Sequence, residues 1–160
     1  AEENERENYM ADEMMIVEQE TAITNSGETF ADRIINQVRE AGFYATFDTT
    51  ERTGQVKLYK ATNASKLLRD YMETPLAIVD FVFTPTTVTT ETGETEQVMG
   101  VYLVGADGTT YVSSSNGVIR SAIQIISMLG EPALWNEPLK VVCCESNTAK
   151  GRRYKYLDLA

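Results

Sequence analysis

The spacing of hydrophobic and polar residues changes along the chain, and each spacing predicts a different element. From Thr29 to Ala41 apolar residues recur every three or four positions, and Gly42 follows where a helix C-cap is expected. This pattern predicts a short amphipathic helix. Residues 43–47 and 55–60 have the pattern of two strands joined by a polar turn, which predicts a hairpin. Residues 65–73 are predicted to form two helical turns.

Beyond Pro75, which prevents further helix, the alternation typical of strands becomes regular. A helix over 117–129 is inserted among these strands. Ser115 or Asn116 is its predicted N-cap, and Gly130 ends it. The predicted strands of this region cover residues 76–89, 98–104, 109–114, 139–145 and 152–159.

Three strands, a helix and two further strands therefore follow one another. This is the chain order of the OB-fold, a five-stranded Greek-key barrel. The predicted fold class is mainly β: a five-stranded OB-fold-like barrel with a helix between strands three and four, plus an N-terminal helix and hairpin. A mixed α+β sheet with a similar element order is the alternative. The predicted domain covers residues 29–160, and residues 1–28 precede it as an arm.

Acidic residues are concentrated at the start of the chain. Residues 1–32 contain ten acidic residues and one basic residue, whereas the net charge of the whole chain is −10. We expect 1–28 to be a disordered acidic arm, because such charge runs are usually solvated. The arm either competes with a nucleic acid for cationic surface or recruits a basic partner, such as a replication protein. Alternatively, its apolar cluster from Met10 to Val17 docks as a short helix.

Composition argues against catalysis. Histidine is absent, which excludes histidine-dependent catalysis and histidine-centred metal sites. Cys143 and Cys144 are adjacent, so we expect no disulfide framework, and one of them buried on its strand. No phosphate-gripping loop, nucleophile elbow or carboxylate pair occurs, and Asp80 is expected on the solvent side of its strand. The prediction is a protein that is not an enzyme and has no cofactor and no metal.

The sequence also bears on location. No run approaches the roughly 20 apolar residues of a membrane span, and the acidic N-terminal residues do not resemble a signal peptide. Cysteine usage fits a reducing compartment. The expected location is therefore the cytoplasm, without membrane contact.

Three clusters supply the cations and the aromatic rings that single-strand binding needs. Cations follow the phosphates, and aromatic faces stack on the bases. The third cluster lies in the loop that corresponds to an oligonucleotide-binding loop of the OB-fold. The candidate nucleic-acid-binding residues are Lys57, Tyr59 and Lys60, then Tyr102 and Tyr111, then Lys150, Arg152, Arg153 and Lys155.

Structural alternatives exist for the first two clusters. Lys57 and Lys60 could be solvated residues of an edge strand. Tyr102 and Tyr111 could be core residues, because tyrosine has an apolar body and a polar tip. Burial in the folded protein distinguishes the two interpretations.

Alternation along the last strand separates its cations from its tyrosines. Arg153 and Lys155 share one face, and Tyr154 and Tyr156 share the other. Arg153 and Lys155 are therefore the preferred phosphate contacts. The loop between the first two barrel strands carries acidic residues that would repel a phosphate, namely Glu91, Glu94 and Glu96.

From Leu58 onward the chain resembles the single-stranded DNA-binding proteins of tailed bacteriophages. The resemblance is carried by the order and spacing of LYKATN, LAIVDFVF, GVYLVGADGTTYVSSS, SMLGEPALW, PLKVV and YKYLDL. It implies an OB-fold protein that coats exposed single strands during phage genome replication or recombination in the bacterial host. Related proteins usually keep an acidic partner-binding tail at the C-terminus, whereas here the acidic segment is N-terminal. The alternative function is a non-catalytic protein-interaction module, a virion or replisome adaptor, on the same barrel.

Overall fold

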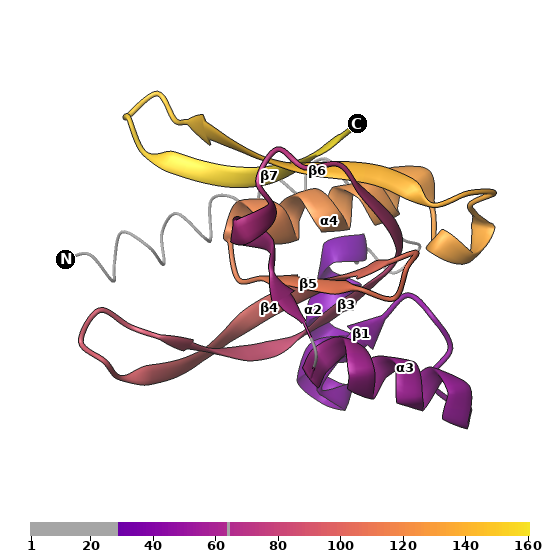
Figure 1. Ribbon diagram of the computed structural model, residues 1–160. Coiled ribbons are helices and arrows are strands. Elements are labelled where there is room, and N and C mark those ends of the chain that lie inside the picture. Colours follow the sequence, from indigo (N-terminus) through magenta and orange to yellow (C-terminus); the bar gives the residue numbers. More distant parts are fainter. Residues whose placement is uncertain (1–28, 64) are drawn as a thin grey trace.

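The computed structural model describes residues 29–63 and 65–160, which form one curled β-sheet with three α-helices (Figure 1). The strands are β1 (Tyr44–Ala45), β2 (Lys66–Leu67), β3 (Leu76–Thr89), β4 (Thr95–Gly105), β5 (Thr110–Ser113), β6 (Leu139–Asn147) and β7 (Arg153–Leu159). The helices are α2 (Phe30–Ala41), α3 (Arg52–Asn63) and α4 (Asn116–Leu129), with short 3₁₀ helices η1 (Leu68–Tyr71) and η2 (Pro132–Leu134). The hydrogen-bonded strand order is β2-β5-β4-β3-β6-β7, and β1 pairs with β3.

Helix α2 confirms the first predicted element. The Thr29 hydroxyl accepts a hydrogen bond from the Asp32 backbone N–H at 3.1 Å, and the Thr29 N–H donates to the Asp32 carboxylate at 3.4 Å. This reciprocal arrangement is a capping box. Gly42 ends the helix in the left-handed region at φ +88°, where a residue without Cβ is favoured.

The meander β3-β4-β5 is also confirmed. Strand β3 pairs with β4 from Ile78 to Thr89, and β4 pairs with β5. The turn between β4 and β5 is fixed by Asp107, whose carboxylate accepts the Thr109 N–H at 2.9 Å. That hydrogen bond lowers the pKa of the Asp107 carboxyl group. Strands β6 and β7 form the second predicted pair of strands, and β6 is joined to β3 over residues 76–78.

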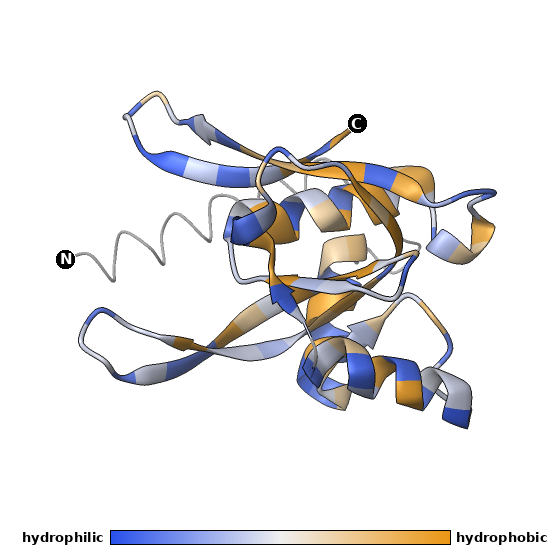
Figure 2. Cartoon of the chain, in the orientation of Figure 1, coloured by the Kyte–Doolittle hydropathy of each residue, from blue (hydrophilic) through white to orange (hydrophobic). Residues whose placement is uncertain are grey.

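Helix α4 lies inside the curl of the sheet, with the predicted N-cap at Ser115 and end at Gly130. Hydrophobic residues gather where α4 meets the sheet, and the hairpin ends are hydrophilic (Figure 2). At Gly117 the first turn of α4 approaches β7 so closely that a Cβ would lie 2.0 Å from the Lys155 carbonyl oxygen. The largest buried core side chains include Phe81, Phe83, Ile34, Leu68, Ile78, Leu103, Ile123 and Ile126.

The prediction of a second hairpin strand over residues 55–60 is wrong, because residues 52–63 form helix α3. Val56 and Leu58 alternate as in a strand, but the less exposed positions, Gly54, Lys57, Leu58 and Ala61, have helical spacing. Gly54 permits the tight entry into the helix, since a Cβ there would lie 1.7 Å from the Asp48 carbonyl oxygen. The fold is therefore mixed α/β rather than mainly β. Of the hairpin's first strand, only Tyr44 and Ala45 pair with β3.

The sheet is an open half-barrel. Strand β5 pairs with the short β2 in parallel, whereas β7 packs on α4 and pairs only with β6 in the described part of the chain. Residues 65–73 supply β2 and one 3₁₀ turn rather than two α-helical turns, so that expectation is also corrected. Among the described residues, no helix is long and apolar enough to span a membrane.

Candidate nucleic-acid interface

The β6–β7 hairpin projects from the body of the molecule and carries the third predicted cluster (Figure 1). We call it the basic hairpin, defined by Lys150, Arg152, Arg153 and Lys155. Its turn is closed by hydrogen bonds from the Thr148 N–H to the Arg152 carbonyl at 2.7 Å and from the Gly151 N–H to the Thr148 carbonyl at 2.9 Å. Gly151 has φ +80°, which favours glycine. The four cations are therefore presented on a short, ordered hairpin.

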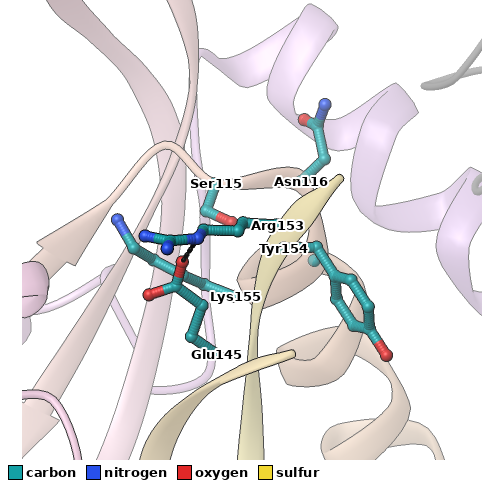
Figure 3. Close-up of a pocket in the computed structure, with 7 residues that line it drawn as sticks. Ser115, Asn116, Glu145, Arg153, Tyr154 and Lys155 are labelled. Atoms are coloured by element: carbon teal, nitrogen blue, oxygen red, sulfur yellow. Dashed lines mark ion pairs between the residues drawn. The ribbon is translucent and has the colours of Figure 1, made fainter. Parts of the chain in front are cut away.

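A pocket of about 290 Å³ lies between the basic hairpin and the start of α4. Figure 3 shows Arg153, Lys155 and Glu145 on one side of β7 and Tyr154 on the other. Arg153 Nε is 3.8 Å from Glu145 Oε1, but the Arg153 side chain is 81% exposed, so this ion pair is weak. The remaining lining comes from Ser115, Asn116 and Gly117.

The helix terminus contributes to the electrostatics of this pocket. The N-cap Ser115 makes no side-chain capping hydrogen bond, and the N-terminus of a helix carries a partial positive charge. Two cationic side chains, one helix terminus and one acid therefore surround the pocket. This combination favours an anion such as a phosphate.

The tyrosines of β7 form a pair on the opposite face of that strand. The rings of Tyr154 and Tyr156 have centroids 5.7 Å apart and an interplanar angle of 37°, and both side chains are half-buried. Alternation along the strand therefore separates cations and tyrosines as expected. The sequence-based candidates did not include these rings, nor the start of α4. The alternation of the sequence already indicated the tyrosines. The start of α4 could not be found in this way, because only the fold brings it next to the hairpin.

The first predicted cluster lies on helix α3 instead of a strand. Lys57 forms an ion pair with Asp80, and its ammonium lies 4.4 Å from the centre of the Phe47 ring. Tyr59 is 70% exposed, and Lys60 is exposed as well. The structure thus separates Lys57, which binds within the protein, from Tyr59 and Lys60, which face the solvent.

Tyr102 and Tyr111 are both buried, with 5% and 8% of their surface exposed. Tyr111 belongs to the main core, and its ring meets that of Tyr71 edge-on at a centroid distance of 5.0 Å. Tyr102 lies on the other face of the sheet, in register with Val82 and Val112. Neither ring has an open face for a base in this conformation. Both tyrosines occupy core positions, which is the alternative that the sequence analysis left open.

The β3–β4 hairpin projects on the same side as the basic hairpin and has the opposite charge (Figure 1). Its exposed acidic residues are Glu91, Glu94 and Glu96. Negative charge repels phosphates, so this hairpin is the less suitable of the two for contact with a nucleic acid.

Other chemistry is limited in the described part of the chain. No group of three or more His, Cys, Asp or Glu residues there could hold a metal ion. Asp80 is buried rather than on the solvent side, because it accepts hydrogen bonds from Lys57 and from the Thr46 hydroxyl at 2.9 Å. Burial raises the pKa of Cys143 to about 11, and Cys144 is half-buried. These thiols are therefore mainly protonated near neutral pH and are weak nucleophiles.

The comparisons with known proteins define the class. The family model described as phage single-stranded DNA-binding protein matches residues 37–160, so the chain is a non-catalytic single-stranded DNA-binding protein that acts in phage replication. It belongs to the Phi29 phage single-stranded DNA-binding protein family. No curated protein and no solved structure matches the chain. The family favours nucleic-acid binding over an interaction module without nucleic acid.

Proposed function

We propose that the basic hairpin is the principal phosphate contact of the bound single strand. The observation that carries this proposal is the pocket in which Arg153 and Lys155 meet the N-terminus of α4. Lys150 and Arg152, at the tip of the same hairpin, extend the cationic surface along the strand. Contacts to phosphates do not depend on the base, so the binding is expected to tolerate any sequence.

We further propose that the half-barrel is an open variant of the OB-fold. The order β5-β4-β3-β6-β7 supports this, because it is the strand order of an OB-fold barrel without its closing pair. In that alignment, the basic hairpin corresponds to the loop between the fourth and fifth strands, one of the contact sites for oligonucleotides. The missing closure has a structural cause, since β2 occupies the edge of β5 and α4 packs against β7.

Tyr59 and Lys60 on α3 provide the second proposed contact. Both side chains are exposed. The Tyr59 ring provides a stacking surface, and the Lys60 ammonium takes part in no ion pair among the described residues. Lys57 supports this surface through its pair with Asp80 rather than by touching the strand. Tyr102 and Tyr111 are buried and stabilise the sheet by packing.

The acidic segment 1–28 lies outside the described residues, and its role is part of the proposal. Its charge favours competition with the strand for the basic hairpin, or contact with a basic replication protein. Residues 29–160 would then be the binding domain. The proposed place of action is the cytoplasm of the bacterial host, where the phage genome is replicated.

The test is a fluorescence titration of the full chain with oligo(dT), the matching duplex and the matching RNA at two salt concentrations. We expect oligo(dT) to bind more tightly than the duplex. If about four phosphates are neutralised, the log–log salt slope is roughly −3, and affinity falls about 60-fold between 50 and 200 mM salt. A salt-independent interaction, or equal affinity for the duplex, contradicts the proposal.

A further inference from the structure

A groove of about 400 Å³ lies between helix α3 and the turn that joins β4 to β5. Its walls are mostly aliphatic, with Val56 on the helix and Val79 and Val104 on the sheet. The volume lies within the range of small-ligand pockets. No side chain fills this space. The groove is separate from the main core, which lies on the other side of the sheet around α4.

Cations stand at the edge of the groove. Lys60 lines it and takes part in no ion pair among the residues of the described ranges. Lys57 also lines it, but Asp80 binds its ammonium. Tyr59, the next residue along the helix, is 70% exposed. Val56, Tyr59 and Lys60 share one face of α3, because residues three and four apart are neighbours on a helix.

We propose that this groove accepts one base of the bound single strand while Lys60 holds the adjoining phosphate. Aliphatic walls contact the flat face of any base without reading its hydrogen-bonding edge, which suits a protein that binds without sequence preference. The ligand class is the single-stranded DNA that the family binds. The inference rests on the proposed function, to which it adds a nucleotide subsite on α3, separate from the basic hairpin.

Valine methyl resonances provide the direct test. The full chain, labelled at its valine methyl groups, is titrated with oligo(dT) and with an abasic oligomer of equal length, which has the phosphates without the bases. The methyl signals of Val56, Val79 and Val104 are expected to shift with oligo(dT) and to remain in place with the abasic oligomer. Equal shifts with both oligomers, or none with either, would overturn the subsite. Shifts that depend on protein concentration without DNA would point to a second copy of the chain instead, and would overturn it too.

A substitution that fills the groove provides the second test. Ala106 lines the groove and is exposed, so Ala106→Phe places a ring in the space proposed for the base. We expect the affinity for oligo(dT) to fall at least about fivefold, which corresponds to about 1 kcal/mol, the low end of the range for one stacked base. Ala160→Phe is the matched control, because Ala160 is exposed and lines a different pocket that shares no residue with this groove. Unchanged affinity in a folded Ala106→Phe protein contradicts the proposal.

The two proposals fail in different ways. If Arg153→Gln leaves the affinity unchanged while the valine shifts persist, the basic hairpin is not the principal contact and the groove remains. If Arg153→Gln weakens binding and the valine signals do not move, the groove is not a subsite and the proposed function remains. Melting temperatures of all variants show whether each protein is folded.

Discussion

The ammonium of Lys57 on helix α3 pairs with the buried carboxylate of Asp80 on strand β3. The same carboxylate accepts a hydrogen bond from the Thr46 hydroxyl at 2.9 Å, and the Phe47 ring lies below the ammonium at 4.4 Å from its centre. Three segments of the chain thus meet at one buried charge. Because Ala61 is the one fully buried residue of α3, this pair is a principal attachment of the helix to the sheet.

Replacing Lys57 is therefore expected to lower the stability of the protein and to change its affinity for DNA much less. Lys57→Met leaves the Asp80 carboxylate buried without its cation, at a cost of about 1–3 kcal/mol in the free energy of unfolding. Lys60→Met is the control, since Lys60 is exposed, and its stability should change by less than about 0.5 kcal/mol. Urea denaturation measures both. Equal stability of the two variants would show that the pair does not hold α3.

The cations of the basic hairpin are expected to act through charge alone. Arg153→Gln and Lys155→Gln should each lower the affinity for oligo(dT) and reduce the magnitude of the log–log salt slope by about 0.7, because each removes one phosphate contact. Lys140→Gln is the matched control on the same pair of strands, at the end of β6 far from the hairpin tip. The prediction fails if the control and the two variants have the same salt slope.

Tyr59 and Tyr111 are expected to behave oppositely. Tyr111→Ala removes a buried ring and should lower the free energy of unfolding by about 3–5 kcal/mol, whereas Tyr59→Ala should leave stability nearly unchanged. Tyr59→Ala should instead weaken DNA binding by about 1–3 kcal/mol, and Tyr59→Phe should retain most of it, since stacking needs the ring and not the hydroxyl. Thermal melts and oligo(dT) titrations separate the two effects. Loss of stability in Tyr59→Ala would place that ring in the core.

The sequence predicted the elements whose limits depend on local chemistry. The helix after Thr29 is fixed by its capping box and by Gly42, and the turn at Asp107 is fixed by one side-chain hydrogen bond. Such signals lie within a few residues of the element that they end. The position of the basic hairpin in the chain was predicted correctly for the same reason. Gly151 and the surrounding cations adjoin one another in the sequence.

The features that sequence analysis missed depend on contacts between distant segments. Val56 and Leu58 fit a strand and a helix equally well, and packing against the sheet decided for the helix. Asp80 was expected on the solvent side of its strand, whereas Lys57 of helix α3, a distant segment in the sequence, packs over it and pairs with it. The pocket beside the basic hairpin exists because Gly117 lets α4 approach β7, and the two segments are far apart in the sequence.

The buried thiol of Cys143 is expected to make the protein less stable at alkaline pH. Its pKa is raised from 9.0 to about 11, mainly by burial, so the folded state keeps a proton that the unfolded state loses above pH 9. Between pH 9 and 11 the unfolded state therefore binds fewer protons, and the free energy of unfolding falls by about 1.4 kcal/mol per pH unit from this group. Below pH 9 both states are protonated at this thiol, and its contribution no longer changes with pH.

Tyrosines and lysines titrate in the same range, so the effect of Cys143 is obtained as a difference between two proteins. The pH dependence of urea denaturation is compared for the natural chain and for Cys143→Ala, in which the other groups are unchanged. The variant is expected to be less stable at pH 8, since a buried side chain is truncated, and its stability should fall less steeply between pH 9 and 11. Thiol labelling provides an independent check: a thiol-reactive probe at pH 8 should modify the half-buried Cys144 before Cys143. Parallel stability curves for the two proteins, together with rapid labelling of Cys143, would mean that this thiol titrates in the folded state as it does in the unfolded chain.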